Sequence, residues 1–152
     1  MPGPVLFCYD GSEGSRSALR EAGDLIARPA DGYVVTVWQP AYVRLAMAGT
    51  FGPAVLSDEA DADEKEAAYA QNVAEEGAKR GREHGYDLAP IAERAEDGVA
   101  QAILGVADRL DVKLIVCGQK GRGPIRTTLL GSVSHALSAH TKRPILIAPE
   151  PK

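Results

Sequence analysis

Short apolar runs alternate with longer amphipathic stretches along the whole chain. The runs are rich in β-branched residues, which favour strands, and the longer stretches place apolar residues at helical spacing. Strands are predicted at residues 5–9, 33–38, 87–95, 112–117 and 145–148. Helices are predicted at about 15–26, 57–84, 99–110 and 133–140. Short strands separated by helices predict an α/β fold with a parallel sheet covered by helices on both faces.

The strand order is predicted from the positions of two candidate ligand-binding segments. Asp10, Gly11 and Ser12 follow the first strand, and a glycine-rich segment follows the fourth. Ligands of open parallel sheets bind beyond the carboxyl ends of strands, where the strand order reverses. If both segments line one crevice, strands one and four are neighbours, which predicts the order 3-2-1-4-5. Pro90 inside the third strand indicates an edge position, because proline cannot donate to a neighbouring strand.

Two features follow the second predicted strand: a segment with glycines and prolines, and a run of acidic residues at the start of the long helix. Residues 40–56 carry glycines and prolines and predict a mobile loop, either a lid over the site or a loosely packed surface excursion. The acidic residues that follow crowd the first turns of the long helix, where the helix dipole favours them. They resemble a metal cluster, but a solvated helix face is the preferred interpretation.

Composition narrows the class of protein. The chain has 152 residues and a formal net charge of -4, which suits a single domain over residues 1–152 and argues against a non-specific nucleic-acid binder. No run is long enough to span a membrane, and no signal-peptide pattern is evident. The only cysteines, Cys8 and Cys117, lie in predicted strands. They indicate core packing in a reducing compartment, and hence a cytoplasmic location. The histidines show no zinc spacing.

The segment 118–134, GQKGRGPIRTTLLGSVS, is the strongest candidate for binding chemistry. Its glycines let backbone N–H groups approach a ligand, and the N-terminus of the next helix favours phosphate. Arg122 and Arg126 add positive charge. Ser132 is predicted to cap the helix by accepting a backbone N–H. The segment is interpreted as a phosphate-binding loop; the alternative is a flexible connector.

The chain resembles the universal stress protein family over essentially its whole length. Nucleotide-binding members carry the motif G-x2-G-x9-G-[S/T], which is present here as Gly118, Gly121, Gly131 and Ser132. The resemblance extends to Asp10 after the first strand and to the five-strand order. It implies an adenine-nucleotide-binding α/β sandwich, with ATP as the ligand, accompanied by Mg²⁺.

The resemblance also implies roles for individual residues. Asp10 would hold the nucleotide or its Mg²⁺, and the backbone at Val37 would contact adenine. The other implied nucleotide-binding positions are Gly11, Ser12, Gly118, Gly121, Arg122, Gly131, Ser132, Val133 and Ser134. The family is usually homodimeric, and the apolar edge strand Ile145–Ala148 predicts dimerisation through that strand. A regulatory role implies an additional protein partner, which the sequence does not identify.

Other nucleotide-binding classes fit less well. The chain has no GxxxxGK[ST] motif, and Gly11 to Gly14 is too sparse for a dinucleotide fingerprint. The same segment also resembles the phosphate loop of adenylating enzymes only faintly. A nucleotide-dependent regulatory module is the preferred function, followed by a slow ATP-hydrolysing or autophosphorylating enzyme and then by a nucleotide-free dimeric scaffold. Because no activated nucleophile is recognisable, turnover is expected below roughly 1 per second.

Overall fold

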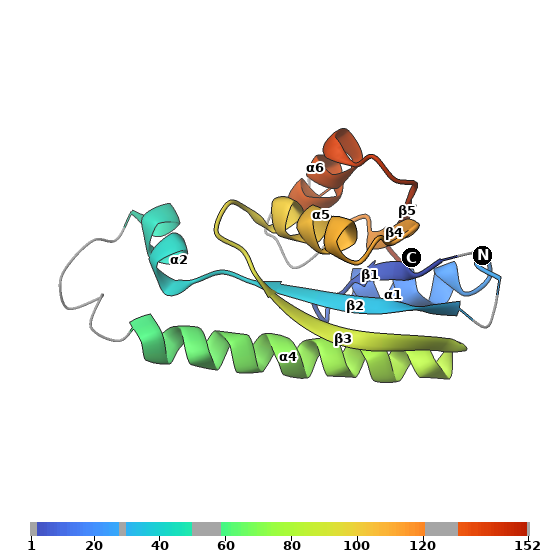
Figure 1. Cartoon of the computed structure of the whole chain (residues 1–152), viewed down its shortest axis with the longest axis horizontal. Helices are drawn as coiled ribbons and strands as arrows, with labels where there is room; N and C mark the ends of the chain where they lie inside the picture. Colours follow the sequence, from blue (N-terminus) through green and yellow to red (C-terminus); the bar gives the residue numbers. More distant parts are fainter. Residues whose placement is uncertain (1–2, 28–29, 50–58, 121–130, 152) are drawn as a thin grey trace.

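The computed structural model describes residues 3–27, 30–49, 59–120 and 131–151. Its centre is a parallel sheet of five strands in the predicted order, β3-β2-β1-β4-β5 (Figure 1). The strands are β1 (Val5–Cys8), β2 (Ala30–Trp38), β3 (Tyr86–Arg94), β4 (Leu114–Gly118) and β5 (Ile145–Ala148). The helices are α1 (Glu13–Ala22), α2 (Ala41–Ala48), α4 (Glu59–Glu83), α5 (Val99–Arg109) and α6 (Ser132–His140).

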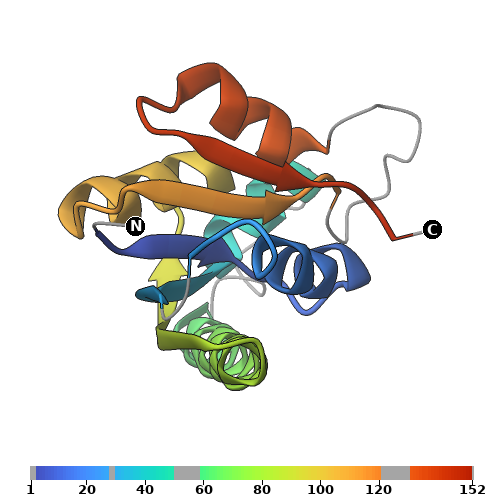
Figure 2. The same cartoon turned by 90° about the vertical axis from the view of Figure 1, so that its right-hand side faces the viewer.

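Helices cover both faces of the sheet. Figures 1 and 2 show α1 and α4 on one face and α5 and α6 on the other. Along β1, Val5 and Phe7 pack on the α1–α4 face, whereas Leu6 packs on the α5–α6 face. All three side chains are at most 1% exposed. Burial on both faces explains why the strand has a continuous apolar run instead of alternating apolar and polar residues.

The second strand begins earlier than predicted. Its start was predicted at Tyr33, after the turn-like pair Asp31-Gly32, but β2 already includes that pair. Gly32 pairs with Val5 of β1, and a Cβ at residue 32 would overlap the Val5 backbone. Glycine is required here by close strand packing rather than by a turn.

The prediction of a loop over residues 40–56 was wrong for its first half. Residues Ala41–Ala48 form α2, which Gly49 ends in the left-handed conformation at φ 71°. The Ala41 N–H donates to Asp63 Oδ1 of α4 at 2.7 Å. This long-range contact stabilises a helix that is too short to be stable alone. Residues 50–56 lie outside the described part of the chain, so the lid interpretation stays a prediction.

The two edges of the sheet are β3 and β5. The edge position predicted from Pro90 is confirmed, because β3 is hydrogen-bonded to β2 alone within the described sheet. At the opposite edge, β5 pairs with β4 in parallel. Among the described residues, no helix is both long enough and apolar enough to cross a membrane.

Candidate functional site

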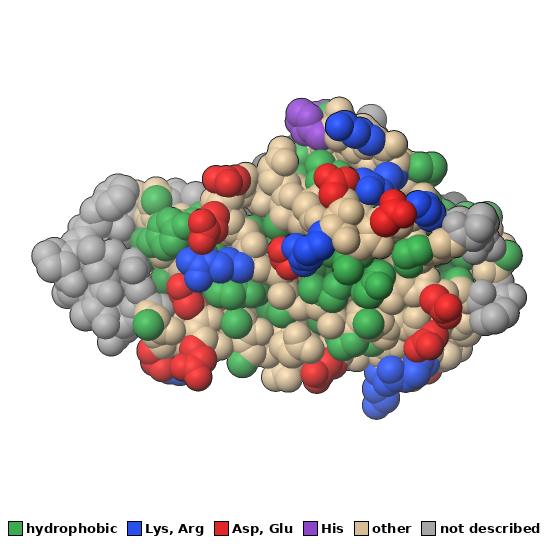
Figure 3. All heavy atoms as spheres, viewed as in Figure 1, with side chains coloured by type: hydrophobic (Ala, Val, Ile, Leu, Met, Phe, Trp, Pro, Cys, Tyr) green, Lys and Arg blue, Asp and Glu red, His purple; other side chains and the backbone are tan. Residues whose placement is uncertain are grey.

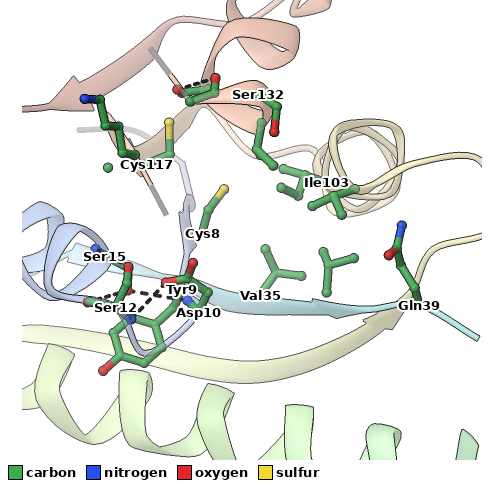
Figure 4. Close-up of a pocket in the computed structure, with 17 residues that line it drawn as sticks. Cys8, Tyr9, Asp10, Ser12, Ser15, Val35, Gln39, Ile103, Cys117 and Ser132 are labelled. Atoms are coloured by element: carbon green, nitrogen blue, oxygen red, sulfur yellow. Dashed lines mark hydrogen bonds between the residues drawn. The ribbon is translucent and has the colours of Figure 1, made fainter. Parts of the chain in front are cut away.

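A cavity of about 520 Å³ lies at the carboxyl ends of β1, β2 and β4. It is placed where the strand order reverses between β1 and β4, the position at which open parallel sheets bind ligands. Figure 4 shows side chains from β1, α1, β2, α5 and α6 around it. Its lining is Cys8, Tyr9, Asp10, Ser12, Ser15, Val35, Val37, Gln39, Val99, Ile103, Cys117, Gly118, Lys120, Gly131, Ser132, Val133 and Ser134.

The turn between β1 and α1 forms one wall. The Asp10 carboxylate accepts the Ser12 N–H at 2.9 Å, and the Ser12 hydroxyl accepts the Ser15 N–H at 3.2 Å. Ser12 is therefore the N-cap of α1. Gly11 supports the turn by adopting φ 78°, a conformation that favours glycine. The chain thus brings the N-terminus of α1 to the cavity with two serine side chains, those of Ser12 and Ser15, in its lining.

The start of α1 packs against the end of β4 with no room for side chains. A Cβ at Gly14 would overlap the Lys120 carbonyl oxygen, and a Cβ at Gly118 would lie 2.8 Å from the Gly14 carbonyl carbon. Backbone atoms of the two segments are therefore in direct contact. This contact was not predicted, because the sequence around Gly14 shows only a poor match to a dinucleotide motif.

The N-terminus of α6 forms the opposite wall. The prediction that Ser132 caps this helix was wrong: Gly131 is the N-cap, without a side-chain cap, and Ser132 is the first helical residue. The serine that is bonded to backbone is Ser134, whose hydroxyl donates to the carbonyls of Gln119 at 2.8 Å and Gly131 at 3.1 Å. Ser132 is left on the cavity wall at the exposed end of the helix.

Backbone contacts pin the two ends of the glycine-rich segment together. The Gly131 N–H donates to the Gln119 carbonyl at 2.8 Å, and the Gln119 N–H donates to Ala148 of β5 at 2.8 Å. Ser134 shares the Gln119 carbonyl. The start of α6 is thereby fixed to the ends of β4 and β5, which holds its N-terminus toward the cavity.

The remaining wall is apolar, and sequence reasoning largely missed it. Val35 and Val37 of β2 and Val99 and Ile103 of α5 line it together with Gln39, and Figure 4 shows Val35, Ile103 and Gln39 around the cavity. Only Val37 was predicted. The sequence placed the others in or beside a predicted strand or helix without a role in the site, since alternation along a strand identifies a face but not whether that face opens onto a cavity.

Both cysteines belong to the cavity lining. Burial raises the pKa of Cys117 to about 11. Burial also raises the pKa of Cys8 well above its ordinary value, with smaller contributions from the charges of Cys117 and Asp10. Both thiols are therefore protonated near neutral pH.

The structure brings most of the predicted site residues to one cavity. Gly11 belongs to the adjoining turn but does not line the cavity, and Gly121 and Arg122 lie outside the described residues. The predicted residues that line it are Asp10, Ser12, Val37, Gly118, Gly131, Ser132, Val133 and Ser134. Among the described residues, no group of three or more His, Cys, Asp or Glu side chains could hold a metal ion.

Comparison with solved structures identifies similar folds. Hypothetical protein MJ0577 is 19% identical, with a TM-score of 0.78 over 100% of this chain and 99% of that one. A universal stress protein solved in complex with cAMP is 25% identical, with a TM-score of 0.66 over 98% of both chains. The universal stress protein from Archaeoglobus fulgidus in complex with dAMP is 19% identical, with a TM-score of 0.62 over 95% of this chain and 96% of that one.

The family assignment rests on a match to a family model. No curated protein matches the chain. The model of the universal stress protein family, in contrast, matches residues 1–149. Because this match spans nearly the whole sequence and agrees with the sheet order, the chain belongs to the universal stress protein family.

Proposed function

We propose that the chain binds an adenine nucleotide, with ATP as the preferred ligand, in the cavity between β1 and β4. We propose further that it acts as a nucleotide-dependent regulatory module. The observation that carries this proposal is the division of the cavity wall. One side is apolar, whereas the other brings together the N-termini of α1 and α6. Such a division suits a ligand with a flat apolar base at one end and phosphates at the other.

The apolar side would take the adenine. Val35, Val37, Val99 and Ile103 would cover the faces of the ring, and Gln39 would supply an amide for its polar edge. The volume of about 520 Å³ lies within the usual range for small-molecule sites.

The polar side would take the ribose and phosphates. Gly131 leaves room for close backbone approach at the start of α6, where the Ser132 side chain also lines the cavity, and Ser12 and Ser15 lie at the start of α1. Each helix N-terminus carries a partial positive charge and unpaired N–H groups, which favour anions. Gly121 and Arg122 complete the proposed phosphate loop through the motif spacing.

Asp10 is the residue proposed to hold Mg²⁺. Its carboxylate lines the cavity and accepts one backbone N–H. Carboxylate oxygen is a ligand that Mg²⁺ prefers, and a cation beside it would reduce the repulsion between Asp10 and phosphate. Bound Mg²⁺ would supply charge neutralisation; the chain's own contribution is to fix the carboxylate by the turn.

Family relatives support the ligand class. The two complexes hold cAMP and dAMP, both adenine nucleotides. We extend this binding to the present chain, with ATP preferred because of the glycine motif. Nucleotide-dependent ordering of the glycine-rich segment would change the surface offered to a protein partner, provided that ATP and ADP bind the two states with different affinities.

Mass spectrometry of small molecules released from freshly purified protein tests the ligand class directly. ATP, ADP or another adenine nucleotide in stoichiometric amount is the expected result. Protein that carries no nucleotide and shows no calorimetric binding of ATP, ADP, AMP or cAMP would support the nucleotide-free scaffold instead.

Gly131→Val tests the glycine loop. Gly131 has φ -67° and ψ 164°, which valine also adopts, so the substitution adds bulk at the cavity wall without forcing the backbone. We expect calorimetry to show ATP binding weakened by at least about tenfold, or about 1.4 kcal/mol. Gly105→Ala on α5, where an added Cβ meets nothing within 4 Å, is the matched control. Unchanged affinity in folded Gly131→Val protein would contradict the proposed phosphate position.

A further inference from the structure

The two cysteines of the chain lie opposite one another on neighbouring strands. β1 and β4 are parallel, and Phe7 pairs with Val116 in their register. The next pair in the same register is Cys8 with Cys117. Both side chains lie on the α5–α6 face of the sheet, where they join the same apolar cluster. The two thiols are therefore lateral neighbours.

Both thiols pack in the apolar cluster and also border the cavity. Cys8 and Cys117 are part of the cavity lining, and Cys8 is partly exposed. Figure 4 shows both side chains directed to the same side of the sheet, whereas the neighbouring Tyr9 ring points toward α4.

The strand spacing suits an ion held between two sulfurs. Neighbouring strands lie roughly 4.7–4.9 Å apart. A metal ion with a sulfur about 2.3 Å away on each side spans about 4.6 Å between the sulfurs. A disulfide needs its Cβ atoms closer, at about 3.8 Å. Both cysteines are free and not disulfide-bonded, and the spacing of their strands leaves room for an ion between the two sulfurs.

We propose that Cys8 and Cys117 form a two-sulfur site for a soft metal ion, with Cu(I) as the matching ion. Soft thiol ligands select Cu(I) over the hard ions that prefer oxygen. Each thiol releases its proton to water as its sulfur binds the metal, and the ion stays Cu(I), so no oxidant or reductant is required. Two ligands suffice for a linear site.

Metal occupancy would also affect the nucleotide. The two sulfurs lie on the cavity wall that Asp10 and Gly118 share, so a bound ion would compete with a nucleotide for space. This consequence rests on the proposed function. The metal site itself does not, and the two are measured separately.

The test is an anaerobic titration of reduced full-length protein with Cu(I) against a chromophoric Cu(I) chelator. We expect one Cu(I) per chain. Cys8→Ala and Cys117→Ala are each expected to weaken binding by at least about tenfold. Met47→Leu is the matched control for thioether binding, because Met1 and Met47 are the other sulfur-containing residues. Melting curves establish that each variant folds. If Cys117→Ala does not fold, the Cu(I) affinity of Cys8→Ala, whose substitution is at a partly exposed position, decides whether the cysteines bind the ion.

Two outcomes would overturn the site. The first is Cu(I) binding of equal strength in folded Cys8→Ala protein. The second is one Cu(I) per two chains with Cu(I)-dependent dimerisation, which indicates bridging between molecules. ATP calorimetry with and without Cu(I) then tests competition. Failure of ATP binding in metal-free protein would count against the proposed function and leave the stoichiometry of the metal site unaffected.

Discussion

At the scale of single residues, Asp10 combines a turn-forming contact with a place in the cavity lining. Its carboxylate accepts the Ser12 N–H at 2.9 Å, so the turn-forming role is present in the structure. The same side chain lines the cavity, so the proposed role as a Mg²⁺ ligand remains open to it. One substitution separates these roles, because the amide oxygen of asparagine can accept the same N–H but carries no negative charge.

Asp10→Asn is expected to weaken binding of Mg-ATP by at least about tenfold while the melting temperature changes little. Binding of ATP in the presence of a Mg²⁺ chelator should be unchanged or stronger, since a negative charge has been removed from beside the phosphates. Calorimetry in both buffers, with a thermal melt, makes the comparison. A lower melting temperature with unchanged Mg-ATP affinity would leave Asp10 as a turn residue only.

Gly14 is a positioning residue outside the family motif. Its missing Cβ lets the first turn of α1 contact the backbone of Lys120, and Gly118 faces it across the same contact. A methyl group at residue 14 meets backbone, which cannot rotate away as a flexible side chain can. The start of the glycine-rich segment, residues 118–120, therefore contacts α1 directly.

Gly14→Ala is expected to displace the start of the glycine-rich segment and to weaken ATP binding by about tenfold or more. Gly105→Ala again serves as the control: it should leave affinity unchanged and stabilise α5 by up to about 1 kcal/mol, because alanine favours helix. Calorimetry and chemical denaturation measure the two effects. Full affinity in Gly14→Ala would show that this contact does not position the binding loop.

At the scale of elements, α2 shows how a tertiary contact forms a helix where local sequence signals predict a loop. The chain around it contains prolines and glycines, and α2 is only 8 residues long. Asp63 of α4 accepts the N–H of its first residue, Ala41, and Arg44 pairs with Glu66 of α4 at 3.0 Å. The two contacts attach α2 to the first half of α4, as Figure 1 shows.

Asp63→Ala is expected to loosen α2 without unfolding the sheet. A hydrogen bond to a charged group contributes about 1.5–3 kcal/mol, so amide exchange across residues 41–48 should accelerate by about tenfold or more. Asp61→Ala, which removes an exposed partner of Lys65 on the same helix, is the control. The measurement is hydrogen exchange followed by mass spectrometry. Equal protection of residues 41–48 in the two variants would contradict this account.

At the scale of the whole molecule, the surface charges and the two sheet edges indicate where a second copy of the chain would pair. On the face shown in Figure 3, acidic and basic side chains are interspersed instead of being gathered by sign. Arg109 and Glu93, for example, form an ion pair at 3.0 Å between α5 and β3. Of the two sheet edges, β3 contains Pro90, which interrupts donation, whereas β5 consists of the apolar residues Ile145 to Ala148. The β5 edge is therefore the better candidate for pairing with a second copy.

We expect a homodimer through β5. Sedimentation velocity at micromolar concentration should give a dimer mass, and two-fold pairing of the same strand would satisfy the open edge in both copies. Amide exchange over residues 145–148 should slow as protein concentration rises, while exchange over residues 86–94 should not change. A monomer mass, or concentration-dependent protection of β3 instead, would contradict this interface.

The sequence by itself determined the strand order and most of the polar site. Apolar runs predicted the strands. The candidate ligand-binding residues at 10–12 and 118–134 predicted that strands one and four are neighbours, as they are in the structure. These features follow from local patterns, because helix and strand periods differ and because ligand-binding turns need glycine and short polar residues. The resemblance to universal stress proteins rested on the same motif.

Only the tertiary structure decided which apolar side chains border a cavity. Val35, Val99 and Ile103 line it, yet their periodicity is that of ordinary core residues. The helical conformation of residues 41–48, the capping of α6 by Gly131 and the alignment of Cys8 with Cys117 were likewise decided by contacts between distant segments. The physical reason is that periodicity fixes the face on which a side chain lies, whereas the space in front of that face depends on how far the covering helices stand from the sheet.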